Sequence, residues 1–198
     1  MKEGFRNIPL SLNGASMFPL EPVKSLVKLS LFVPQSFAIL SSSEANSRLS
    51  ECFPNLEVLR LGGSISSALE RAQLERLPRQ LRDLTISVHS LPHSSMPMEW
   101  IEAMPPNLER LSLPSFSLTE EAPGELSSTI AWPPGLTKLR VGCLPRIHHL
   151  RALPKGLTKF VGAIKAGGTA EDVLMSSLPS SLTHLCVNQA YNTAFVLD

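Results

Sequence analysis

Aromatic and charged side chains are scarce in this sequence. Aromatic residues make up 6% and charged residues 18% of the 198 residues, against about 25% charged residues in an average soluble domain. Disordered segments and coiled coils are rich in charge, and collagen needs far more glycine than the 11 copies present here. The formal net charge of +1 gives no bulk attraction towards nucleic acid or a membrane surface. The composition therefore indicates a folded domain with a sizeable apolar core.

Cysteine is also scarce, and no apolar run is long enough to span a bilayer. Cys52, Cys143 and Cys186 are odd in number and form no CxxC pair, which favours free thiols over disulfides or zinc. The densest apolar stretch, residues 26–33, is interrupted by a lysine and a serine, and a membrane helix needs about 18 apolar residues. The N-terminal residues lack the apolar core of a secretory signal. We therefore expect an intracellular protein, in the cytoplasm or the nucleus.

Leucine and proline are abundant, with 33 and 17 copies, and both recur in one phrase written seven times along the chain. The phrase is a proline, one to three residues, and then LxxLx(L/I/V). Only the sixth copy fails at the third apolar position, where it has Gly162, and its second position is Phe160. The copies begin 30, 25, 27, 28, 21 and 25 residues apart, a spacing typical of a repeated strand unit, and their first leucines are Leu26, Leu56, Leu81, Leu108, Leu136, Leu157 and Leu182.

The repeated phrase predicts parallel strands that bury one column of leucines. Alternation within LxLx(L/I/V) aims every second side chain at one face of a strand. A proline suits the corner before the strand because it has no amide hydrogen to donate to the ladder. Parallel strands need crossovers, and residues 36–49, 64–76, 97–104 and 170–177 have helical patterns, while 142–153 is expected to hold a turn or a single helical turn. In 64–76 the predicted apolar face is Ile65, Ala68, Leu69 and Ala72.

These copies resemble the LxxLxL strand segment of the leucine-rich repeat family, from about Pro22 to the end of the chain. The last copy, LPSSLTHLCVNQAYN, resembles the FNIP subclass, in which an aromatic-asparagine pair follows the strand, here Tyr191 and Asn192. The resemblance implies an α/β solenoid, a horseshoe of seven short parallel strands with variable helical or turn connectors. Residues 5–13 fit the pattern loosely and would add an eighth strand.

The resemblance also implies one domain over residues 1–198. Residues 1–21 would form an N-terminal edge or partial repeat, residues 22–187 the seven repeats, and residues 188–198 the C-terminal end. Members of the family commonly bind proteins through the concave face of the sheet. We therefore expect a non-enzymatic protein-protein interaction module, with no catalytic residue, no cofactor and no metal site.

Two x positions of LxxLxL point away from the leucine column onto this face. At the first position stand Lys28, Val58, Asp83, Arg110, Lys138, Lys159 and His184, and at the second stand Ser30, Arg60, Thr85, Ser112, Arg140, Val161 and Cys186. Six of these residues are lysine or arginine and one is acidic. They best suit a sheet face that is merely solvated, and they also predict a basic groove for an acidic peptide or protein surface. In that groove Arg110, Lys138, Arg140 and Lys159 would form a contiguous positive stripe. The candidate partner-binding residues are Lys28, Arg60, Asp83, Arg110, Lys138, Arg140, Lys159 and His184.

Other functions have less support in the sequence. Nucleic acid is disfavoured because no aromatic side chain stands at these positions for bases to stack on. A structural subunit or fragment of a larger assembly, with contacts through the solenoid ends, is the alternative function because residues 194–197 are apolar rather than a polar cap. That end would fold over the last repeat, pair with another molecule, or mark a piece of a longer protein.

Three pairs of chemically active residues carry little weight. His89 and His93 are separated by a proline that disfavours a helical metal site, and the adjacent His148 and His149 suit a surface turn. Cys186 and His184 would share a strand face, but no carboxylate or oxyanion donor accompanies them. None of these pairs predicts an enzyme.

Overall fold

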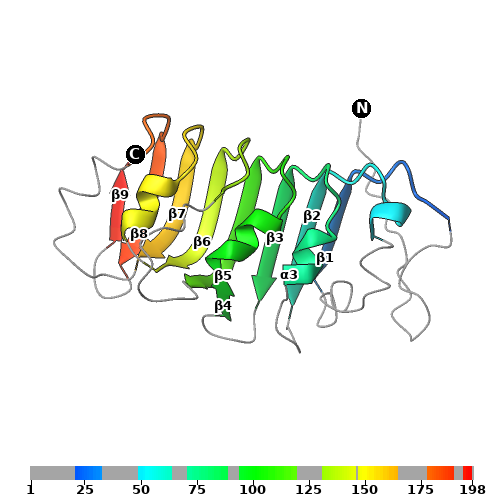
Figure 1. Cartoon of the computed structure of the whole chain (residues 1–198), viewed down its shortest axis with the longest axis horizontal. Helices are drawn as coiled ribbons and strands as arrows, with labels where there is room; N and C mark the ends of the chain where they lie inside the picture. The colour runs from blue at the N-terminus through cyan, green and yellow to red at the C-terminus, as the bar shows by residue number, and fades with distance from the viewer. Residues whose placement is uncertain are drawn as a thin grey trace.

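One sheet runs through the described part of the chain. The computed structural model describes residues 21–32, 49–63, 71–88, 94–119, 131–145, 147–164, 178–189 and 194–197. These residues form a nine-stranded sheet in the order β1-β2-β3-β5-β6-β7-β8-β9, with β4 paired to β5 (Figure 1). Its strands are β1 (Lys28–Phe32), β2 (Val58–Gly63), β3 (Asp83–Val88), β4 (Ser94–Pro97), β5 (Arg110–Thr119), β6 (Lys138–Leu144), β7 (Lys159–Ile164), β8 (His184–Gln189) and β9 (Ala194–Leu197).

The seven strands predicted from the repeated phrase are confirmed, and they are parallel. Each begins two residues after the first leucine of its copy. The second apolar residues face the core, where all but the first are at most 4% exposed: Leu59, Leu84, Leu111, Leu139, Phe160 and Leu185. Because the pairing keeps the same register from strand to strand, the apolar column predicted from sequence is continuous from β2 to β8.

The backbone repeats one hydrogen-bond pattern at the entry to each of the seven strands of the repeated phrase. The amide of each first leucine donates to the carbonyl three residues earlier, as from Leu81 to Pro78 at 3.1 Å and from Leu157 to Pro154 at 3.0 Å. One carbonyl then accepts two amides of the next copy: Glu57 accepts from Arg82 at 2.8 Å and from Asp83 at 3.0 Å. In the third to seventh copies the carbonyl that accepts from the first leucine belongs to a proline, which has no amide hydrogen of its own to donate.

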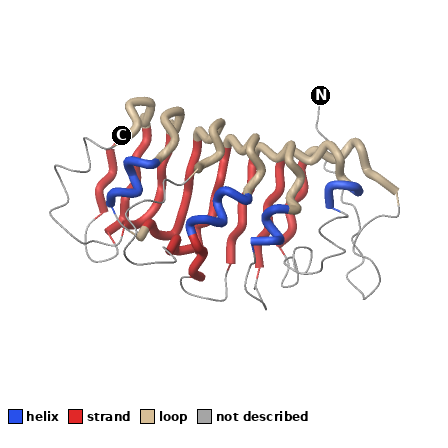
Figure 2. The backbone as a smooth tube through the Cα atoms, in the orientation of Figure 1, coloured by secondary structure: helices blue, strands red, loops and turns tan. Residues whose placement is uncertain are grey.

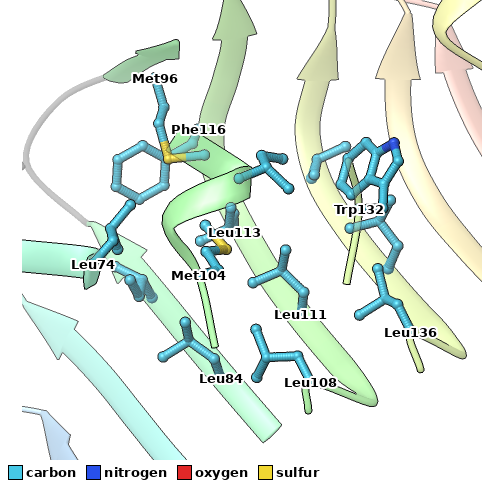
Figure 3. Close-up of a cluster of buried hydrophobic side chains, with 14 of the residues drawn as sticks. Leu74, Leu84, Met96, Met104, Leu108, Leu111, Leu113, Phe116, Trp132 and Leu136 are labelled. Carbon is cyan, nitrogen blue, oxygen red and sulfur yellow. The ribbon is translucent and has the colours of Figure 1, made fainter. Parts of the chain in front are cut away.

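Short helices cover one side of the sheet. Residues 49–52, α3 (Arg71–Glu75) and the 3-10 helices η1 (Met98–Ala103) and η2 (Ile147–Ala152) all lie on that side (Figures 1 and 2). Helical connectors at 97–104 and 142–153 are thereby confirmed as single 3-10 segments. Figure 3 shows the core beneath them, where Leu74, Met96 and Met104 lie against the sheet residues Leu84, Leu111, Leu113 and Phe116. The opposite side of the sheet is called the open face below.

The predicted apolar face of residues 64–76 is wrong at the one member that the structure describes. Ala72 is exposed, whereas Leu74 is 0% and Leu77 is 3% exposed. Burying two leucines removes more apolar surface from water than burying one alanine, so α3 turns Leu74 inward. Ile65, Ala68 and Leu69 lie outside the described residues, as do the predicted strand at 5–13, the helical pattern at 170–177 and most of 36–49.

The C-terminal end folds back onto the last repeat. β9 pairs antiparallel with β8, with Leu185 opposite Leu197 and Asn188 opposite Ala194. This agrees with the first of the three arrangements predicted for the apolar residues 194–197, in which they fold over the last repeat. The outer edge of β8 is therefore paired within the chain, which protects backbone groups that would otherwise be open to another strand.

A ladder of polar side chains ties the strand entries together. The residue before the first leucine donates to a main-chain carbonyl of the preceding copy: Asn55 to Lys24 at 2.8 Å, Asn107 to Arg79 at 3.1 Å and Ser181 to Lys155 at 2.6 Å. Gln80 makes the equivalent bond to Pro54. Gly135 and Gly156 hold this position in the fifth and sixth copies and have no side chain to donate.

Gly156→Asn is expected to raise the free energy of unfolding by about 1 kcal/mol. A Cβ at Gly156 would have no heavy atom within 4 Å, so the asparagine fits without strain and loses less backbone freedom on folding than glycine. Its amide would extend the ladder to the carbonyl of Pro134. Urea denaturation beside Gly156→Ala checks this, since equal stability of the two variants would show that the added hydrogen bond contributes nothing.

Candidate functional site

The residues that leave the core alternate onto the open face in two rows. The first row follows the strand pairing Lys28, Val58, Asp83, Arg110, Lys138, Lys159 and His184. The second row, two residues further along each strand, is Ser30, Arg60, Thr85, Ser112, Arg140, Val161 and Cys186. These rows are the same two sets that the leucine pattern predicted, so the structure brings all eight candidate residues onto one face.

The candidates differ in exposure and in partners. Asp83 is only 8% exposed and His184 is half-buried. The six lysine and arginine side chains are exposed, and they come from five strands: Lys28, Arg60, Arg110, Lys138, Arg140 and Lys159. Because the sheet is parallel and in register, neighbours within a row stand about 4.8 Å apart at the backbone.

Asp83 neutralises part of this face. Its Oδ2 lies 3.1 Å from an Nη atom of Arg60 on β2 and 4.0 Å from Nη1 of Arg110 on β5. The two arginines are about half exposed, so solvent screens both pairs and each contributes about 1 kcal/mol or less to stability. The carboxylate therefore balances positive charge between β2 and β5.

Three cations of the open face lie beyond β5. Within the described ranges, Lys138, Arg140 and Lys159 have no carboxylate within ion-pair distance. Lys138 is the strand partner of Lys159, and Arg140 follows Lys138 by two residues on β6. We call Lys138, Arg140 and Lys159 the basic cluster. It holds three of the four residues of the predicted positive stripe, centred on β6 and β7 and flanked by Arg110 on β5 and His184 on β8.

A threonine ladder holds the strands under this cluster. Thr137, Thr158 and Thr183 directly precede Lys138, Lys159 and His184, and each hydroxyl donates to a carbonyl of the preceding strand entry. The distances are 3.0 Å to Glu109, 3.0 Å to Thr137 and 3.2 Å to Thr158. The ladder therefore adds a side-chain hydrogen bond at each of these three strand entries, directly before the residues of the first row.

The threonines were not among the sequence candidates, although the signal was present. Three consecutive copies read LTKL, LTKF and LTHL, which place a hydroxyl before Lys138, Lys159 and His184. In the earlier copies the same position holds Val27, Glu57, Arg82 and Glu109. There Arg82 and Glu109 make an exposed ion pair of 3.2 Å. The threonines thus mark the part of the sheet that carries the basic cluster.

The chemically active pairs give no arrangement typical of a catalytic or metal site among the described residues. No group of three or more histidine, cysteine or acidic side chains there could hold a metal ion. Cys186 and His184 share the open face of β8, as their spacing predicts. The surface turn expected at His149 is wrong, because η2 buries this residue to 5% exposure. His89 and His93 lie outside the described residues.

Two general findings remain, one on membrane-spanning helices and one on similarity to known proteins. In the ranges that the structure covers, no helix has the length and apolarity that crossing a membrane demands. The chain matches no family model, no curated protein and no solved structure.

Proposed function

We propose that the chain is a leucine-rich repeat protein that binds an acidic protein partner and catalyses no reaction. In this proposal the open face is the concave inner surface of an α/β solenoid. Seven copies of LxxLx(L/I/V), a common register and connectors on one side of the sheet support it. Recognition of the family rests on the sequence resemblance and not on the sheet alone, because one fold hosts many functions.

The basic cluster carries the functional part of the proposal. Lys138, Arg140 and Lys159 are exposed on a chain whose formal net charge is only +1. Positive charge is thus concentrated on β6 and β7, while Asp83 balances the arginines between β2 and β5. Local complementarity of this kind selects partners and speeds their encounter even when the whole protein is nearly neutral.

Reversing two charges of the cluster is expected to abolish binding of acidic peptides. Random peptides displayed on phage and selected on the wild-type protein should become enriched in aspartate and glutamate. Lys138→Glu with Arg140→Glu should lose this enrichment and select lysine and arginine instead, because the sign of the local field is inverted. Deep sequencing of the selected pools measures the change in composition.

A matched control separates the site from net charge. Lys24→Glu with Lys155→Glu makes the same change in charge at two exposed lysines in the strand-entry turns, and it should leave the acidic enrichment intact. If the Lys138→Glu, Arg140→Glu protein selected peptides as acidic as those that the wild type selects, the open face would be rejected as the binding surface. Binding at the cluster should also weaken as salt rises, since exposed charge contacts are screened.

A further inference from the structure

The basic cluster packs three positive charges into a small area of sheet. Lys138 and Lys159 are partners on neighbouring strands, about 4.8 Å apart at the backbone, and Arg140 lies about 7 Å from Lys138 along β6. All three side chains are exposed. A single carboxylate balances one of these charges and leaves two unmatched.

A phosphate monoester suits this charge density better than a carboxylate does. It carries about −1.5 to −2 charges at neutral pH and three acceptor oxygens. Carboxylates on one side of an extended peptide recur only every two residues, about 7 Å apart, with one charge each. Arginine can bind two oxygens of a phosphate with its planar fork, and lysine adds a compact point charge.

We propose that the basic cluster recognises a phosphorylated serine or threonine within an acidic segment of a protein. This inference rests on the proposed function and names the ligand chemistry of the same site. Arg140 binds two phosphate oxygens, and Lys138 and Lys159 bind the remaining oxygen and balance the second charge. Arg110 and His184, at either end of the first row, contact acidic residues that flank the phosphorylated one.

The occupant is a protein segment rather than a nucleic acid. The two rows that face outward contain no phenylalanine, tyrosine or tryptophan, and single-strand recognition usually depends on stacking of bases on several such rings. The paired charges at Arg60, Asp83 and Arg110 also interrupt the positive row after β5. A nucleic-acid backbone carries a phosphate at every nucleotide and needs a longer continuous row of positive charge. A single phosphate group fits a compact cluster.

Fluorescence anisotropy with three labelled peptide pools tests the proposal. The pools share random flanks rich in aspartate and glutamate, and their central residue is serine, glutamate or phosphoserine. The phosphoserine pool should bind wild-type protein about tenfold more tightly than the glutamate pool. Lys138→Ala with Arg140→Ala should reduce this ratio to about one. Lys24→Ala with Lys155→Ala should preserve it, and thermal melts should show that both variants fold.

The outcomes separate this inference from the proposed function. Equal affinity for the glutamate and phosphoserine pools overturns phosphate recognition but leaves acidic-peptide binding intact. Failure of all three pools to bind overturns both. A preference for phosphoserine that survives in the Lys138→Ala, Arg140→Ala protein places the phosphate elsewhere and overturns the assignment. Tighter binding of a single-stranded oligonucleotide than of the phosphoserine pool identifies the ligand as nucleic acid and overturns it too.

Discussion

Gly162→Val is expected to lower the free energy of unfolding by about 3 kcal/mol, although valine and leucine occupy this position in most other copies of the repeat. A Cβ at Gly162 would lie 3.1 Å from Cζ of Phe160, 3.0 Å from Cγ2 of Val141 and 3.1 Å from its carbonyl oxygen. Phe160 is fully buried, and its ring occupies space that an aliphatic third residue fills elsewhere. In the sixth copy, therefore, a larger residue at the second apolar position, Phe160, is compensated by a smaller one at the third, Gly162.

The exchange predicts coupling between the two positions. Phe160→Leu alone removes ring volume that Gly162 cannot replace, and the cavity should cost about 1–2 kcal/mol. Combining Phe160→Leu with Gly162→Val restores the leucine and aliphatic pair of the other copies. The double variant should be more stable than the sum of the single effects predicts, by about 1–2 kcal/mol. Guanidinium denaturation of the four proteins measures this double-mutant cycle.

Recovery in the double variant should remain incomplete. Between the pairs Arg140–Val161 and Cys143–Ala163, β6 has two residues where β7 has only Gly162. Val141 therefore approaches Gly162 with main chain as well as side chain, and Phe160→Leu does not relieve that contact. Additive single effects, within about 0.5 kcal/mol, would show that the phenylalanine ring is not what keeps the third residue small.

The parallel sheet and its register could be predicted because they follow from spacing alone. A strand with one buried side chain at every second position has only one register that buries them all. The seven leucine phrases therefore predicted both which residues pair and which ones leave the core. Lys138, Lys159 and His184 accordingly lie side by side, as expected from three copies that are 21 and 25 residues apart.

Two departures from the repeated leucine pattern have different causes: one comes from the volume of a core side chain, the other from the reach of a long surface side chain. The Phe160 and Gly162 exchange was visible as a failed copy, but only the packing shows that the two changes compensate. Asp83 was predicted as an isolated acidic residue of the open face. Its pairing with Arg60 runs diagonally between the rows, so it depends on how far an arginine reaches and not on register.

The same distinction limits prediction of the site. The sequence predicted eight candidate residues from their outward positions and singled out Arg110, Lys138, Arg140 and Lys159 as a contiguous positive stripe. Burial and ion pairing around Asp83 divide them into a balanced part and the basic cluster. The helical connectors were less predictable, since their apolar residues are few and α3 buries Leu74 instead of Ala72.

Gly142→Ala is expected to destabilise the protein by about 3 kcal/mol, because the methyl group would meet main-chain atoms. A Cβ at Gly142 would lie 2.7 Å from the carbonyl oxygen of Phe116 and 2.9 Å from that of Pro114. These carbonyls belong to a bulge in β5: the register jumps from Leu113 to Ser117 while β6 advances only from Val141 to Cys143. Main chain cannot swing aside as a flexible side chain does, so β5 itself must shift.

The damage should spread to β4, which distinguishes this prediction from a local clash. β4 pairs with β5 at Phe116–Thr119, a segment that begins within the bulge. Amide hydrogen exchange in residues 94–96 should therefore accelerate in Gly142→Ala, together with the loss of stability measured by urea denaturation. Gly135→Ala is the matched control, because its Cβ would meet only the Leu108 carbonyl at an ordinary 3.7 Å. Equal stability of the two variants would mean that β5 adapts to the added methyl group and that the bulge does not require glycine on β6.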